Sequence, residues 1–407
     1  MGHGRNGPVR HHPLRRRGAA AALDDFHDRT EFGYFGESAG STGAAMVSGA
    51  DAKWDCSYIY LGQQGDSELT VAAGGQVSSV YALLAESPGS TANITVTGPG
   101  SQWTNGFRLY LGSRGNASLL IQAGGRVDSF DCRIGEYTGG TGTVTVSGVG
   151  TQWNNSAWLA VGERGSGTLR VEAGGRVTSG LGLIGSYSIA TGKVTVSGAG
   201  SQWTTTDDLA VGSAGILNIV DGELVSVAGE LAINIFARAG DGFVNMSSGG
   251  MLALNGEAAD SLSQFLDLVV GTDAIRYWNA GNGAWSPLTS ATYGEDYTLE
   301  FLTSGDLIGY TLLTVFAAEP TGDFDGDVDV DGADFLAWQR GESPAPHAAA
   351  DLTAWQIRYG ATSQNLATAA APEAAASILM GIGATALLLL RRRPGRAAQR
   401  RVGVPLA

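Results

Sequence analysis

Hydrophobic and polar residues alternate through the middle of the chain in short runs that are separated by glycines. In the run LRVEAGGRV (169–177), Leu169 and Val171 point to one side of an extended strand, and the polar residues between and after them point to the other. The following Gly174 and Gly175 supply a turn that needs positive φ. The pattern predicts many short strands, each with one buried face, joined by tight glycine turns.

Two phrases recur at a fixed spacing. The phrases ITVTGPGSQW, VTVSGVGTQW and VTVSGAGSQW alternate with LTVAAGGQV, LLIQAGGRV and LRVEAGGRV. Each unit of about 50 residues therefore contains two half-units of roughly 23 and 27 residues. A half-unit cannot bury its row of Leu and Val alone, but it can do so when it stacks on its neighbours.

A period near 25 residues, with strands and no helical segment, is typical of one coil of a parallel β-helix. Residues 43–257 would give roughly eight or nine coils, and at ~4.8 Å per coil a rod about 40 Å long. A leucine-rich repeat has a similar period, but its Asn/Cys ladder and helical half are absent from the sequence. We predict a mainly β fold whose body is a parallel β-helix, or β-solenoid.

The tryptophans of the repeats have two interpretations. They are spaced 49, 50 and 50 residues apart at Trp54, Trp103, Trp153 and Trp203. They could form a stacked aromatic ladder that caps the edge of the core, or a platform on which sugars stack. Equal spacing favours the ladder. With these GxGSQW-type phrases, the chain resembles the large exported β-solenoid repeat proteins of planctomycete-type bacteria, a resemblance that implies the fold and no activity.

Residues 258–318 have a different character and are expected to form a β-rich cap over the open end of the solenoid. SLSQFLDLVVG (261–271) predicts a short helix, and the YTLEFL and YTLLTV segments predict strands. Without such a cap the last coil would expose a strand edge. The same protein group often has a similar DYTL…GYTLLTV segment. At the other end, residues 1–42 are expected to be a basic, irregular leader.

Composition agrees with this fold and narrows the function. Gly accounts for 62 of 407 residues without a three-residue period, which excludes collagen, and a hydrophobic content of 43% excludes a disordered acidic tail. The net charge is −14, but residues 1–17 and 391–407 carry five and six Arg and no acid. The 14 basic and 39 acidic residues between them give that body −25. We expect no nucleic-acid partner, because an acidic surface repels phosphate.

The strongest chemical motif is an acidic run, GDFDGDVDVDGADFLAWQRG (322–341). Its carboxylates have the ligand spacing 1, 3, 5, 7, 9 and 12 of an EF-hand-type loop, at Asp323, Asp325, Asp327, Asp329, Asp331 and Asp334. Position 7 usually binds the ion through its backbone carbonyl, so the Asp329 side chain is not expected to coordinate the Ca²⁺ directly. The spacing predicts one Ca²⁺ site, with Asp334 capping a helix that follows.

Residues 319–360 resemble a dockerin type I module. DLTAWQIRYG (351–360) echoes DFLAWQRG (334–341), which gives two helices with one Asp-x-x-Ala-Trp-Gln plan. The resemblance implies two calcium loop–helix segments that bind cohesin domains on a partner protein. The sequence departs from the family twice: PAPHAAA (344–350) replaces the second carboxylate loop, and Val328 stands where position 6 is usually Gly. One Ca²⁺ is therefore expected, and cohesin binding stays open.

The C-terminal region predicts export. An Ala-rich linker (361–373) leads to residues 374–401, where an uncharged, mostly apolar run just long enough to span a bilayer is followed by Arg residues. With Pro372 and Glu373 before it, this layout resembles a PEP-CTERM sorting signal. The resemblance implies insertion in the inner membrane, cleavage by an exosortase-like enzyme, and a cell-surface or extracellular location. The apolar stretch at 18–23 is too short for a signal peptide, so we expect that the true start is mis-set or its leader lost.

Catalysis is the less favoured hypothesis. Cys56 and Cys132 lie about three coils apart, beyond disulfide reach, and four of the five His lie in the expected leader. Carboxylates at turn-like positions are the remaining candidates for a polysaccharide hydrolase or lyase: Asp207 with Asp208, Asp128 with Asp131, and Glu136. They share no single repeat position. The favoured hypothesis is a non-enzymatic structural or adhesive surface protein, with an extracellular polysaccharide or a cohesin-like protein as its expected partner.

Overall fold

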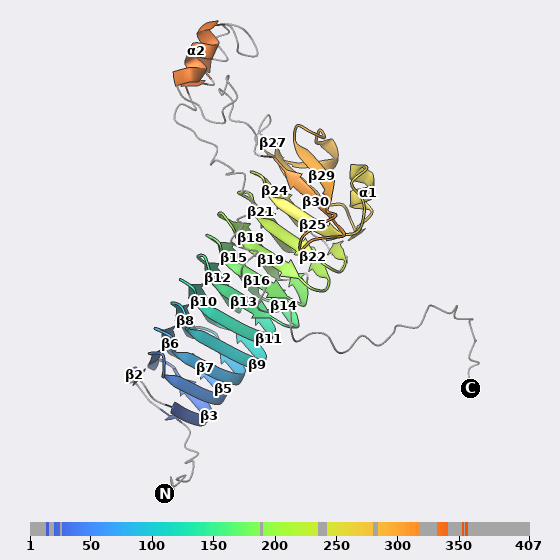
Figure 1. Cartoon of the computed structure of the whole chain (residues 1–407). Coiled ribbons are helices and arrows are strands. Elements are labelled where there is room, and N and C mark those ends of the chain that lie inside the picture. Colours follow the sequence, from blue (N-terminus) through green and yellow to red (C-terminus); the bar gives the residue numbers. More distant parts are fainter. Residues whose placement is uncertain are drawn as a thin grey trace, which may run out of the picture. The chain divides into compact units, whose positions relative to one another are not determined.

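The computed structural model describes residues 27–187, 190–234, 242–279, 284–316 and 332–340, with short pieces at 14–15, 20–24, 352–353 and 355–356. The chain divides into units 1–364 and 365–407, and every described residue belongs to the first. Its strands stack in a ladder that Figure 1 shows from β3 in blue to β25 in yellow. Successive coils pair in parallel, which confirms the predicted β-solenoid.

Each coil contributes one strand to a sheet of twelve strands, here sheet 2. The strands of sheet 2 are β2 (Ala20–Asp24), β4 (Thr42–Ser48), β6 (Asp66–Ala72), β8 (Thr91–Thr97), β10 (Asn116–Gln122), β12 (Thr141–Ser147), β15 (Ser166–Glu172), β18 (Thr191–Ser197), β21 (Gly215–Ile219), β24 (Phe243–Met246), β27 (Ile275–Asn279) and β28 (Ala284–Pro287).

Each coil also contributes one long strand, or two short ones, to a sheet of eighteen strands, here sheet 1. The strands of sheet 1 are β1 (Leu14–Arg15), β3 (His27–Phe35), β5 (Lys53–Leu61), β7 (Gln76–Leu84), β9 (Gln102–Leu111), β11 (Arg126–Ile134), β13 (Gln152–Asn155), β14 (Trp158–Val161), β16 (Arg176–Ser179), β17 (Leu181–Ile184), β19 (Gln202–Thr205), β20 (Leu209–Val211), β22 (Leu224–Val227), β23 (Leu231–Ile233), β25 (Met251–Asn255), β26 (Val269–Gly271), β29 (Tyr297–Phe301) and β30 (Tyr310–Val315).

The core is built from columns of aliphatic side chains that stack from coil to coil. In β15, Leu169 and Val171 are fully buried while Arg170 is exposed, as the alternation predicts. Register keeps equivalent residues together, so that one inward position of sheet 2 is β-branched through eight successive coils. These fully buried residues are Val47, Val71, Val96, Ile121, Val146, Val171, Val196 and Ile219. Such a column buries apolar area only when coils stack.

The glycine turns differ from the expectation at one position. Ala173 (φ 52°) and Gly174 (φ 87°) adopt the left-handed conformation, and Gly175 does not. Gly175 is required for another reason: a Cβ there would collide with the carbonyl oxygen of Val146 in the preceding coil. The second glycine of the phrase therefore permits close backbone approach between coils rather than a positive φ.

The end of the solenoid is closed by a change of strand direction. β30 pairs antiparallel with both β25 and β29, and β28 pairs antiparallel with β27. The short helix α1 (Leu262–Leu266) begins after Ser261, whose Oγ accepts the backbone N–H of Gln264 at 3.2 Å. A 3₁₀ turn, η1 (Leu288–Ser290), follows β28. The antiparallel strands lie on the edge that would otherwise continue the parallel ladder.

The ladder begins earlier than the expected boundary at residue 43. β2 pairs in parallel with β4, and β3 pairs in parallel with β5 over His27–Phe35. Part of the segment expected to be an irregular leader therefore forms the first coil. The alternation is hidden in HDRTEFGYF because the buried positions include Thr30 and Gly33, while the outward positions include the aromatic Phe32 and Tyr34.

Helix α2 (Gly332–Arg340) covers the phrase predicted to be helical. It begins before Asp334, which lies in its first turn, so the prediction that Asp334 caps the helix is wrong. The Phe335 ring lies 4.9 Å from that of Trp355, centroid to centroid. The other five carboxylates of the acidic run, the linker at 361–373 and the expected sorting signal at 374–401 lie outside the described residues. In the described part of the chain, no helix has the length and apolar character needed to cross a membrane.

Candidate functional site

The repeat tryptophans lie in the core, where they are at most 1% exposed. The last three have valines as register partners on both sides: Trp103, for example, pairs with Val77 and with Val127. The prediction that the tryptophans stack on one another is therefore wrong. They recur every second coil, so a valine coil separates successive rings by about 10 Å. The rings are also unavailable as a platform for sugars.

Each buried indole is satisfied by a hydroxyl from the preceding coil. The Nε1–H groups of Trp103 and Trp153 donate to the Oγ atoms of Ser79 and Ser129, at 3.0 and 3.1 Å. Trp54 and Trp203 make the equivalent bonds to a Thr and a Ser. The signal for these partners is present in the sequence as Val-x-Ser after each Gly-Gly turn, and it was not recognised. The bonds make the tryptophans structural residues whose polar atom has a fixed partner.

Asp128 lies on the outer face of sheet 1 in a hydrogen-bonded row that crosses three coils. It accepts bonds from Gln102 Nε2 (2.7 Å), Asn154 Nδ2 (2.9 Å) and the Arg126 guanidinium (2.8 Å). Burial opposes ionisation, but the bonds from Arg126, Asn154 and Gln102 outweigh it and lower the pKa of Asp128. A carboxylate held in this way is a cross-coil clamp and a poor proton donor.

Asp131 belongs to a separate cluster with two arginines. Arg108 Nε and Arg133 Nε each lie 3.7 Å from one of its carboxylate oxygens. Burial raises the pKa of Asp131, and the positive charges of Arg133 and Arg108 offset part of the effect. Arg133 also pairs with Glu163 at 3.0 Å. Asp128 and Asp131 therefore belong to different clusters, although they are three residues apart.

Glu136 and the Asp207–Asp208 pair lie in other settings. Glu136 is 5% exposed and accepts a bond from Ser113 Oγ at 2.9 Å. Burial raises its pKa, while bonds from Ser113 and Tyr137 act in the opposite direction. Asp208 Oδ1 accepts the backbone N–H of Glu230 at 2.8 Å, between β19 and β20. The carboxylates of Asp128, Asp131, Glu136 and Asp208, four of the five catalytic candidates, are each tied to a local partner.

An aromatic ladder that sequence reasoning missed lies on the outer face of sheet 1, in the first coils. Phe32 stacks on Tyr58 (5.1 Å between centroids) and Tyr34 on Tyr60 (5.0 Å), with interplanar angles of 16° and 9°. Tyr81 continues the row. Aromatic residues at alternate positions of neighbouring parallel strands are the available signal. Because these rings stack face to face, they stabilise strand pairing more than they offer free ring faces.

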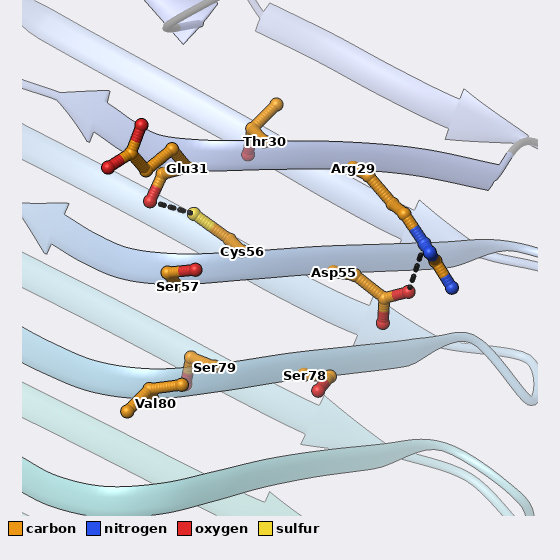
Figure 2. A pocket seen from close by; sticks show the side chains of 9 residues that line it. All are labelled: Arg29, Thr30, Glu31, Asp55, Cys56, Ser57, Ser78, Ser79 and Val80. Atoms are coloured by element: carbon orange, nitrogen blue, oxygen red, sulfur yellow. Dashed lines mark hydrogen bonds and ion pairs between the residues drawn. The ribbon is translucent and has the colours of Figure 1, made fainter. Parts of the chain in front are cut away.

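A groove lies beside this ladder, where the strands of sheet 1 bend. Its volume is about 710 Å³, and nine residues from β3, β5 and β7 line it: Arg29, Thr30, Glu31, Asp55, Cys56, Ser57, Ser78, Ser79 and Val80. Figure 2 shows the Arg29–Asp55 ion pair (3.4 Å) at one end and Glu31 at the other. The two carboxylates therefore do not converge on one point. The groove presents hydroxyls, one ion pair and an apolar rim.

An exposed apolar ridge continues from this groove along the bend. We define the ridge as Val80, Phe107 and Phe130, which are 51%, 44% and 45% exposed. They occupy consecutive coils, and the two phenyl rings stack with centroids 6.2 Å apart. Phe107 is carried outward by an irregularity in β9, where the register with β7 shifts between Ser79 and Tyr81.

In the described part of the chain, the side chains form neither a cluster of metal ligands nor a disulfide. No group of three or more His, Cys, Asp or Glu side chains there could hold a metal ion. Both Cys56 and Cys132 are buried and no disulfide joins them, as their separation predicted. Comparisons with known protein families and with curated proteins found no match to this chain.

Proposed function

We propose that this chain is an exported, non-enzymatic structural or adhesive protein of the cell surface or extracellular matrix, in which the solenoid is the presented part. The observation that carries the proposal is the coil-to-coil bonding of the outward polar side chains. Gln102, Asp128 and Asn154 hold one another across three coils, and Thr178 donates to Asn154 Oδ1 at 3.0 Å. Side chains that bond to one another between coils stabilise the solenoid, and they are not free to act on a substrate.

The environment of the candidate carboxylates supports a non-enzymatic role. Hydrolysis or elimination on a polysaccharide needs two groups of different protonation facing one open cleft. Among the candidates, Asp131 is instead paired with an arginine, as the neighbouring Glu163 is, and Glu136 is buried on a hydroxyl. The alternative function, a secreted polysaccharide hydrolase or lyase, would need these bonds to open on substrate binding.

The attachment of the solenoid is part of the same proposal. A PEP-CTERM-like signal at 374–401 would hold the chain in the inner membrane until an exosortase-like enzyme cuts near Pro372 and Glu373. The acidic run from Asp323 to Asp334 would bind one Ca²⁺ between the solenoid and this signal. An ordered calcium loop would shorten and stiffen the connection, because an unliganded run of carboxylates repels itself.

The test separates the two functions by product release. The purified full-length chain is incubated with mixed soluble polysaccharides, and new reducing ends and unsaturated products are measured. We expect release no higher than with Glu136→Gln or Asp131→Asn. Release above background that either substitution abolishes would overturn the non-enzymatic proposal and establish the hydrolase or lyase.

A further inference from the structure

The groove and the ridge together form a surface that the stability of the fold does not explain. Val80 belongs to both, since it lines the groove and begins the ridge. At the bend itself the next two coils carry small residues, Ser156 and Gly180, although Trp158, two residues after Ser156, is also 51% exposed. Large apolar side chains left half-exposed on three successive coils, beside a groove, mark an interaction site rather than a structural need.

The chemistry of the groove fits a ligand with hydroxyl groups. Ser57 and Ser78 present hydroxyls, and the Arg29–Asp55 pair presents donors and acceptors within one 3.4 Å contact. This pair is exposed, with 73% and 44% of the two side chains accessible. A hydroxyl group can donate to the carboxylate and accept from the guanidinium at once. Phe107 stacks on Phe130 and also lies under the Arg108 guanidinium, 4.8 Å from the ring centroid. The ridge therefore offers the C–H groups of a sugar the exposed parts of its side chains rather than a fully free face of Phe107.

The charge of the chain and of the groove limits which ligands this surface can bind. The chain between its two basic ends carries −25, which repels a polyanion and also repels a second copy of the same chain. The groove itself holds one cationic and two anionic side chains, Arg29 against Glu31 and Asp55, so it offers no anion site. An uncharged, hydroxyl-rich polymer meets no electrostatic barrier there.

We propose that an uncharged polysaccharide binds along the bend of the first coils, with hydroxyls in the groove and sugar rings against Phe107 and Phe130. The site repeats along the solenoid axis because β7, β9 and β11 are in parallel register, so the ligand is a linear chain lying across several coils. This inference rests on the proposed adhesive role and names its partner class. The contact with sugar rings is thus proposed for the outer face of the solenoid and not for the buried repeat tryptophans.

The test is affinity electrophoresis of the full-length chain in native gels that contain dextran, laminarin, xyloglucan or alginate. We expect at least one of the three uncharged polymers to retard the wild-type chain, and alginate not to. Phe107→Ser combined with Phe130→Ser should weaken the retardation at least about fivefold, because two apolar ring contacts are lost. Both side chains are exposed, so the fold should be retained. Val149→Ser, at a position 85% exposed in a turn, is the matched control and should bind normally.

Three results would overturn the inference: retardation by none of the uncharged polymers, equal retardation of the double variant, or retardation by alginate alone. Sedimentation of the wild type and the double variant gives a further arm, since a dimer that the double substitution abolishes would identify a second copy as the occupant. A negative result in these gels would overturn polysaccharide binding alone. The proposed surface location is tested separately, by labelling of cells.

Discussion

Glu223 makes the stability of the solenoid dependent on pH in a direction that can be worked out. It occupies the place that Gly175 has in an earlier coil, and it is only 2% exposed. Burial raises its pKa to about 7, although the backbone N–H groups of Ser201 and Gly200 favour the carboxylate, and the charge of Asp221 adds to the increase. The folded chain therefore holds this carboxyl protonated at pH values where the unfolded chain has released the proton.

The sign follows from that difference. The stabilisation is fully present below the ordinary carboxyl pKa of 4.5 and is lost as the pH rises through about 7. At about 1.4 kcal/mol per pKa unit, the folded state loses about 3 kcal/mol between these limits. Glu223→Gln keeps the shape and removes the titration, so it should exceed the wild type in stability by up to about 3 kcal/mol at pH 8.5 and by much less at pH 5.

The assay is urea unfolding of the full-length chain at pH 5 and pH 8.5, with the variant-minus-wild-type difference in free energy as the measured quantity. Glu68→Gln, on the exposed face of β6, is the control and should show no such pH-dependent gain. A Glu223→Gln difference that is the same at both pH values would refute the reasoning.

Three further predictions concern other parts of the chain. In a urea titration, Trp153→Phe should lower the free energy of unfolding by about 1–3 kcal/mol, because a buried indole and its hydrogen bond are lost. The control Trp158→Phe, at a side chain that is 51% exposed, should change the free energy of unfolding by less than about 0.5 kcal/mol. Calorimetry should show one Ca²⁺-binding event in the full chain and none after Asp323→Asn with Asp325→Asn; an unchanged event would place calcium elsewhere. The Cys132 thiol, whose pKa burial raises, should resist a disulfide reagent until urea unfolds the coils, and rapid modification of the native chain would contradict its burial.

The coil architecture could be predicted from the sequence because its determinants are local and repeated. The alternation in LRVEAGGRV, which places Leu169 and Val171 inside, follows from strand geometry alone. The Trp ladder was mispredicted because the period of the tryptophans is two coils, so that Val127 and its equivalents separate them. Comparing the 50-residue Trp spacing with the 25-residue coil would have shown this.

The outer surface was harder to predict because it depends on neighbours about 25 residues away and on where the strands bend. Asp128 and Asp131 look like a carboxylate pair in the sequence. In the structure each bonds to different residues from other coils, so they lie in two separate clusters. Phe107 lies where the register between β7 and β9 shifts. Such irregularities have no periodic signal in one sequence.

Surface labelling of intact cells of the producing organism, with an antibody raised against the solenoid, tests the central claim most directly. An exported structural or adhesive protein should be labelled without permeabilisation, and the label should be lost after external protease treatment. Labelling that appears only after the cells are permeabilised, with the chain intact after external protease, would contradict an exported structural or adhesive role.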